Sequence, residues 1–127
     1  MNSTIYRAIQ GEDNPYLARI ITSILEELEV PKKGTGFADF SIQNMYAAFS
    51  KTKTFYFVLE QDGIVLGGSG IVPLSGASKD VCELQKMYLD PAVQGRGHGK
   101  YLLQFCLDKA RELGYKICYL ETMSIMK

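Results

Sequence analysis

The sequence lacks net charge, long apolar runs and a secretory leader. Fourteen Lys and Arg residues balance fourteen Asp and Glu residues, whereas a general nucleic-acid or membrane-surface binder needs a positive field. No apolar run approaches the roughly 20 residues of a membrane-spanning helix. The first residues, MNSTIYRAIQ, have neither the basic nor the apolar region of a signal peptide. We therefore expect no nucleic-acid and no membrane partner, although a small local basic site remains compatible with a neutral chain.

Cysteine and histidine are also scarce. The three cysteines, Cys82, Cys106 and Cys118, are an odd number without CxxC spacing, and each has apolar or strand-like neighbours. This pattern favours buried free thiols in a reduced, cytoplasmic compartment. The only histidine, His98, lies in a glycine-rich segment, which argues against a catalytic Cys–His pair.

What is present is typical of a compact globular chain. The 127 residues are 46% hydrophobic and 22% charged, close to the averages for folded proteins. One domain commonly takes about 100–150 residues. We therefore expect a single domain over residues 1–127 with a core that needs no disulfide or structural metal.

Hydrophobic periodicity and turn signals predict the order β-α-α-β-β-β-α-β. Asn14 suits a helix N-cap and Pro15 the first helical position, Asp62-Gly63 favours a type I′ hairpin, and Gly114 suits a helix C-cap. The expected strands are 5–9, 54–61, 64–73, 81–89 and 117–122, and the expected helices are 15–30, 42–49 and 100–113. The three middle strands should pair antiparallel, and the strand–helix–strand unit from Val81 to Thr122 should pair parallel. The fold class is therefore α/β, a mixed central sheet with helices on both faces. Glycines 67, 68 and 70 mark a strand whose backbone something must approach closely.

The segment QGRGHG, residues 94–99, stands between a predicted strand and a predicted helix. The first amides of a helix lack internal acceptors, and the helix dipole adds about half a positive charge there. Gly95, Gly97 and Gly99 leave room for a ligand, and Arg96 and Lys100 can add charge. Together these features predict a phosphate or pyrophosphate cradle. The spacing fits neither the Rossmann GxGxxG pattern nor the P-loop.

These residues resemble the acyl-CoA signature of the GCN5-related N-acetyltransferases, or GNAT family. The signature is Gln94-x-x-Gly97-x-Gly99 between a strand and an amphipathic helix. Met87-Tyr88-Leu89-Asp90-Pro91 is similar to the strand end that precedes it in the family, and Gly114-Tyr115 to the segment that follows. The resemblance covers residues 4 to 123 in element order. It implies the acyl-CoA N-acyltransferase fold, and acetyl-CoA as cosubstrate without a metal.

The resemblance also implies which residues bind the cosubstrate. Backbone amides from Gln94 to Gly99 would bind the pyrophosphate. Amides at Met87 and Leu89 would contact the pantetheine arm and the thioester carbonyl, on a strand that carries a bulge and splays from its parallel neighbour. The expected cofactor-binding residues are Met87, Tyr88, Leu89, Gln94, Gly95, Arg96, Gly97, His98, Gly99 and Lys100.

The implied reaction is attack of a neutral primary amine, from a small molecule or amino acid, on acetyl-CoA. A base must remove a proton from the amine, and Glu83 is the best candidate, because the family often has an acid there. A salt-bridged strand glutamate is the alternative role for Glu83, and Glu121 is the second candidate base. We expect the His98 side chain to point outward without a catalytic role. Residues 30–39, Phe37 and Phe40 would border the acceptor.

The family fold normally continues past residue 122 with a helix and two strands, and that helix often bears the tyrosine that protonates the leaving thiolate. This sequence ends at Lys127, so the expected fold is C-terminally short and no general acid is named. A truncated chain, completion by a second chain as in a homodimer, and a short family member are all open. A CoA-binding or assembly module without catalysis is therefore the alternative function, and a phosphate-binding regulator of another fold is the third.

Overall fold

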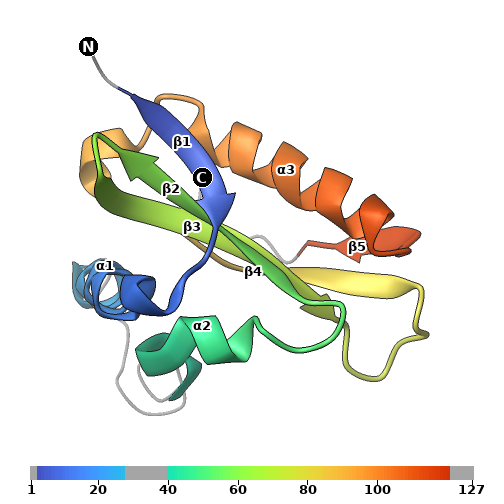
Figure 1. Ribbon diagram of the computed structural model, residues 1–127. Helices are drawn as coiled ribbons and strands as arrows, with labels where there is room; N and C mark the ends of the chain where they lie inside the picture. Colours follow the sequence, from blue (N-terminus) through green and yellow to red (C-terminus); the bar gives the residue numbers. More distant parts are fainter. Residues whose placement is uncertain (1–2, 28–39, 121–127) are drawn as a thin grey trace.

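The computed structural model describes residues 3–27 and 40–120 of the chain. Its centre is a five-stranded sheet in the order β1-β2-β3-β4-β5 (Figure 1). The strands are β1 (Thr4–Ala8), β2 (Phe55–Gln61), β3 (Ile64–Pro73), β4 (Val81–Leu89) and β5 (Ile117–Tyr119). Neighbours from β1 to β4 pair antiparallel, and β4 and β5 pair parallel. The mixed sheet predicted from the sequence is thus confirmed.

Helices cover both faces of the sheet. Figure 1 shows α1 (Asn14–Glu27) and α2 (Met45–Ala48) on one face and α3 (His98–Glu112) on the other. The first face is closed by one apolar cluster in which Leu17 and Ile21 of α1 meet Tyr56 and Val58 of β2. In the cluster under α3, Cys106 and Ala110 meet Ile71 of β3 and Cys82 of β4. No helix in the described ranges is long and apolar enough to cross a membrane.

The entry into α1 differs from the sequence prediction. A 3-10 turn, η1 (Gly11–Asp13), precedes the helix, and Gln10 and Asp13 form a capping box around it. Asn14 therefore does not cap its own helix. Its Oδ1 accepts a hydrogen bond from Tyr46 N–H at 2.8 Å, and its Nδ2 donates to Asn44 Oδ1 at 2.9 Å. Asn14 ties α1 to α2, a long-range role that local capping preferences do not reveal.

Other local predictions hold. Asp62 and Gly63 both have positive φ, 52° and 84°, as a type I′ hairpin requires. Gly114 ends α3 at φ 95°. The amides of Gly114 and Tyr115 donate to Arg111 O and Ala110 O, the pattern of a Schellman C-cap. The predicted helix at 42–49 is instead a 3-10 turn, η3 (Phe40–Asn44), followed by the single turn of α2.

The cysteines are free, as predicted: Cys82 and Cys106 are buried and Cys118 is half-buried. Burial raises the pKa of Cys82 and of Cys106 to about 12. Because the thiolate is the reactive form, these two thiols are chemically quiet at neutral pH.

The glycines of β3 make room for the ring of Tyr56. A Cβ atom added at Gly70 would lie 2.6 Å from Tyr56 Cδ2, 2.7 Å from Phe49 Cε1 and 2.5 Å from Phe55 O. One at Gly68 would also collide with the Tyr56 ring. The close approach expected at this strand therefore comes from a core aromatic ring of the chain itself.

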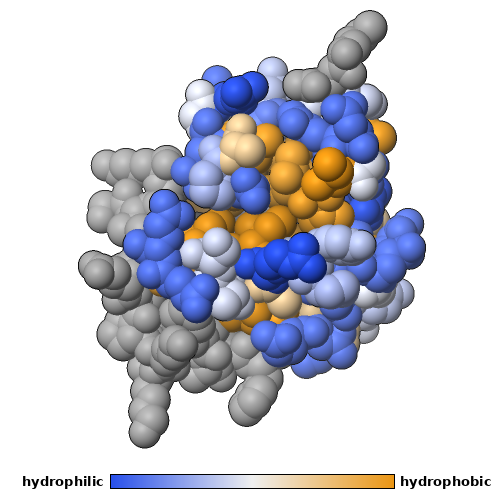
Figure 2. Space-filling model, turned by 90° about the vertical axis from the view of Figure 1, so that its left-hand side faces the viewer, coloured by the Kyte–Doolittle hydropathy of each residue, from blue (hydrophilic) through white to orange (hydrophobic). Residues whose placement is uncertain are grey.

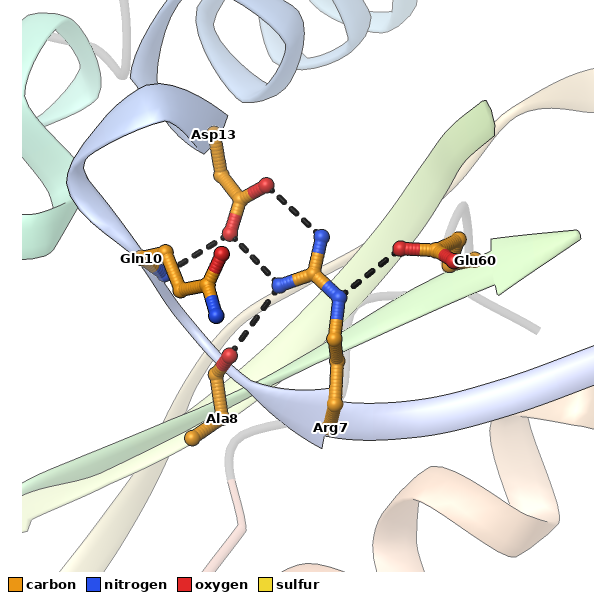
Figure 3. A network of polar contacts seen from close by, with 5 residues as sticks. All are labelled: Arg7, Ala8, Gln10, Asp13 and Glu60. Carbon is orange, nitrogen blue, oxygen red and sulfur yellow. Dashed lines mark hydrogen bonds and ion pairs between the residues drawn. The ribbon is translucent and has the colours of Figure 1, made fainter. Parts of the chain in front are cut away.

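An ion-pair network joins β1 to η1 and β2 (Figure 3). The Arg7 guanidinium donates two hydrogen bonds to Asp13, each 2.8 Å, and a third from Nε to Glu60 Oε1 at 2.8 Å. Asp13 is 2% exposed and also accepts from Gln10 N–H at 2.7 Å. Burial alone would raise the pKa of Asp13, but the bonds from Arg7 and Gln10 outweigh it and hold the pKa below its usual value.

Asp13→Asn should lower the free energy of unfolding by about 2 kcal/mol at pH 7, because it removes charge-assisted hydrogen bonds. Since the Asp13 pKa is lower in the folded chain than in the unfolded chain, the stabilisation is complete above about pH 5 and is lost as pH falls below about 3.9. Urea unfolding of the wild type and of Asp13→Asn should show the difference in their free energies of unfolding shrinking as the pH is lowered. Asp108→Asn, in an exposed pair with Arg111, is the control and should change stability by less than about 1 kcal/mol. A stability difference between wild type and Asp13→Asn that does not depend on pH would contradict the role given to the Asp13 carboxylate.

Gly70→Ala should lower the free energy of unfolding by about 3 kcal/mol, because the new methyl group overlaps a packed ring and a backbone carbonyl. Gly99→Ala is the control, since its nearest neighbours are 3.8 and 3.9 Å from the new Cβ. Alanine in a helix is favoured over glycine by up to about 1 kcal/mol, so the control should be neutral or stabilised. Equal urea midpoints for the two variants would contradict the packing described.

Candidate active site

Strand β4 has a parallel neighbour along only its first three residues in the described part of the chain. There, β4 and β5 pair at Val81–Ile117, Cys82–Cys118 and Glu83–Tyr119. From Leu84 to Leu89, β4 pairs with β3 on one side and, among the described residues, has no strand on the other. This stretch therefore presents one row of backbone groups that β5 does not use.

A bulge in β4 decides which amides belong to that row. Leu74 N–H donates to Val81 O at 3.1 Å, so strict alternation from Val81 would turn odd-numbered residues toward β3. Yet Asp90 N–H donates to Leu66 O at 2.8 Å, which places an even-numbered residue toward β3. The change occurs where the register shifts opposite Gly68–Gly70, at Lys86, whose φ is 57°. Beyond the bulge, the backbone of Leu89 faces away from β3.

The predicted cradle lies between β4 and α3. A 3-10 turn, η4 (Pro91–Val93), follows β4 and is capped by the Asp90 side chain. Gly97 is the N-cap of α3 at φ 85°, and Tyr101 N–H donates to Gly97 O. The amides of His98, Gly99 and Lys100 thus have no acceptor inside the helix. Arg96 and Lys100 are exposed. A backbone of this form can bind an anion.

The strand end and the cradle are in contact. The Cβ position at Gly99 lies 3.8 Å from Leu89 Cδ1 and 3.9 Å from Met87 Sδ. Gln94 folds back so that its Nε2 donates to Leu89 O at 2.9 Å. A Cβ at Gly95 or Gly97 would meet no atom within 4 Å, so the loop is open over these glycines. Figure 2 views the side on which β3 and α3 begin, and it shows apolar side chains in the middle of this face with hydrophilic residues around them.

His98 corrects one prediction. Its side chain is half-buried instead of pointing outward, and its Nδ1 lies 2.7 Å from Tyr6 Oη in a hydrogen bond across 92 residues. The Tyr6 ring also packs against Phe105, with centroids 5.0 Å apart. His98 thus fastens the start of α3 to β1. No sequence signal pairs these two residues, because the contact depends on how β1 joins the sheet.

Glu83 lies opposite Tyr119 in the last β4–β5 pair of the described residues. Its Oε1 accepts a 2.7 Å hydrogen bond from Gln85 Nε2. Neighbouring Cys82 and Leu84 pack under α3, so by strand alternation Glu83 points to the face of the sheet that carries α1 and α2. Tyr88, also predicted as a site residue, packs against the cluster on that same face.

Several predicted positions lie outside the described residues. They are the second candidate base, Glu121, and the acceptor loop at 30–39 with Phe37; the side chain of Phe40 is likewise not described. The sequence interpretation in turn missed Tyr56, whose phenol donates to Lys86 O at 2.7 Å. Its signal was present: two glycines spaced by two in a strand leave room for a neighbouring ring.

Comparison with known proteins agrees with this geometry. The model of the Acetyltransferase (GNAT) family matches residues 19–125. An Escherichia coli K12 protein named Uncharacterized N-acetyltransferase YjgM is 41% identical over 126 residues, covering 98% of this chain and 75% of the relative.

Solved structures show the same fold. A GNAT-family acetyltransferase from Staphylococcus aureus Mu50 superimposes with a TM-score of 0.82 at 18% identity, covering 97% of this chain and 76% of that one. One from Brucella melitensis in complex with acetyl-CoA gives a TM-score of 0.76 at 25% identity, covering 96% and 78%. With the family match spanning most of its length, the chain belongs to the GNAT family of acetyltransferases.

Proposed function

We propose that this protein transfers the acetyl group of acetyl-CoA to a primary amine of a small molecule or amino acid. The observation that carries the proposal is the contact of the glycine cradle with the end of β4, where the bulge turns the Leu89 amide away from β3. A related GNAT structure was solved in complex with acetyl-CoA. The reduced state of the cysteines supports a cytoplasmic location, and we treat residues 1–127 as one domain.

The cosubstrate would bind along the path that joins the cradle to the edge of β4 that faces away from β3. The amides from Gln94 to Gly99 and that of Lys100 would hold the pyrophosphate, with the exposed side chains of Arg96 and Lys100 adding positive charge. The acyl arm would then pass Met87 and Leu89, and Tyr88 would line the far side. The Leu89 amide faces away from β3 and is directed toward this path, so it can donate to the thioester oxygen as an oxyanion-type contact.

Glu83 would act as the base. Its carboxylate would accept a proton from the ammonium form of the substrate, directly or through a water. The neutral nitrogen would then attack the thioester carbon: a C–N bond forms, the C–S bond breaks, and the sulfur leaves as the CoA thiolate, which takes up the proton that the acylated nitrogen loses. Glu83 points to the face of α1 and α2, opposite α3, so the amine would enter from that face. No metal takes part in this scheme.

One observation favours the alternative, a CoA-binding or assembly module. The apolar side chains of Ile117, Tyr119 and Leu120 on and next to β5 are 59%, 46% and 39% exposed. An edge of this kind is a pairing template, and a homodimer formed through it would complete the sheet. Such a module would bind CoA without releasing thiol.

Free-thiol release from acetyl-CoA, measured with a panel of primary amines and amino acids, tests the proposed reaction. Glu83→Gln should lower kcat/KM by about a hundredfold, because a positioned base commonly contributes at least that factor, and CoA affinity should be unchanged. Glu112→Gln, exposed on α3, is the matched control and should keep the wild-type rate. Full activity in Glu83→Gln would contradict the role of Glu83 as the base, and Glu83 would then be only a hydrogen-bond partner of Gln85. No release with any amine, by a protein that binds CoA, would favour the module.

Gly97→Asp should weaken CoA binding measured by calorimetry, compared with Gly97→Asn. Both side chains tolerate positive φ, so the comparison isolates charge. A carboxylate beside the pyrophosphate costs on the order of 1–4 kcal/mol, about fivefold or more in Kd. Gly76→Asp is the control, since Gly76 has φ 81° and open surroundings but lies in the β3–β4 turn. Equal CoA affinities for the Asp and Asn variants at position 97 would contradict the proposal that this loop binds the pyrophosphate.

A further inference from the structure

Tyr56 makes a contact that the packing of its ring does not require. The residue is 1% exposed, and its ring lies over Gly68 and Gly70 and against Phe49, with ring centroids 4.8 Å apart. Such packing would serve a phenylalanine equally well. The phenol oxygen, however, donates a 2.7 Å hydrogen bond to the carbonyl of Lys86, the bulge residue of β4.

The Lys86 carbonyl lies where β4 changes which of its residues direct their backbone groups toward β3. Val81 and Asp90 both use their backbone groups toward β3, although one is odd-numbered and the other even-numbered. Without the extra residue at the bulge, alternation would turn the Leu89 amide into the β3–β4 ladder. With it, the Leu89 amide faces away from β3, toward the edge of β4 that carries no strand beyond Glu83 among the described residues.

We propose that Tyr56 is a positioning residue for acyl transfer: by holding the Lys86 carbonyl, it fixes the β4 bulge and thereby directs the Leu89 amide at the thioester oxygen. This proposal rests on the proposed function, because it assigns a catalytic purpose to the direction of that amide. Tyr56 itself touches neither cosubstrate nor amine in this scheme.

The surroundings of Tyr56 keep this hydrogen bond constant. Burial raises the pKa of the phenol well above its usual value, so the hydroxyl remains a donor across the working pH range. Gly68 and Gly70 lack the Cβ atoms that would collide with the ring, so the ring can lie over β3. Lys86 has a left-handed φ of 57°, which costs a non-glycine residue free energy, and the Tyr56 bond offsets part of that cost.

The chain offers a matched pair of variants for the test. Tyr115 is 4% exposed, and its phenol also donates to a backbone carbonyl, Lys53 O, at 2.7 Å. Tyr56→Phe and Tyr115→Phe thus delete the same atom and the same type of bond, but only the first touches the bulge. Both variants should lose a similar amount in urea midpoint.

Two measurements then separate positioning from simple stability. The kcat for acetyl-CoA turnover should fall about tenfold in Tyr56→Phe, because small misplacements of a catalytic group reduce rates strongly, and stay within about twofold of wild type in Tyr115→Phe. Amide hydrogen exchange over residues 86–89 should quicken in Tyr56→Phe and not in Tyr115→Phe.

Equal kcat values for the two variants, or equal exchange over residues 86–89, would overturn the proposal. The exchange comparison needs no activity, so it separates this proposal from the proposed function. If the wild-type protein releases no thiol, the proposed reaction fails, and exchange alone then decides whether Tyr56 holds the bulge.

Discussion

Strand β4 pairs with two neighbouring strands whose hydrogen-bonding patterns differ. It pairs antiparallel with β3 to its last residue, yet it pairs parallel with β5 over only three. The bulge at Lys86 reconciles the two, because one extra residue reverses which backbone groups face which neighbour. A left-handed residue costs about 1–2 kcal/mol, and the buried ring and hydroxyl of Tyr56 lie where they can offset it.

The remaining parts of the candidate site lie before and after that bulge along β4. The cradle at the start of α3 touches the end of β4 through Gly99, while Glu83 lies opposite Tyr119 near the start of β4 and points to the other face. The chain is a member of the GNAT acetyltransferase family, and its neutral composition suits an anion site built mainly from backbone amides. Such a site needs few lysines and arginines, so overall charge carries no information about it.

Much of this could be predicted from the sequence, because the relevant signals are local. The limits of β3 and β4, the turn at Asp62-Gly63 and the cap at Gly114 depend on residues within a few positions of one another. Asn14 and His98 behaved otherwise, since their partners, Tyr46 and Tyr6, are 32 and 92 residues away. Tyr56 lies between these cases: the glycines that admit its ring were visible, but the register that places it against them was not.

The quiet thiols of Cys82 and Cys106 have a consequence for a protein that works with coenzyme A. Each turnover of the proposed reaction would release a free thiol, and any oxidised coenzyme nearby is a partner for thiol–disulfide exchange. Exchange begins with attack by a thiolate, and both cysteines are buried with a pKa near 12. These two thiols under α3 are thereby insulated from the redox state of the cosubstrate pool, so accumulated product would compete for the site without becoming covalently attached to them.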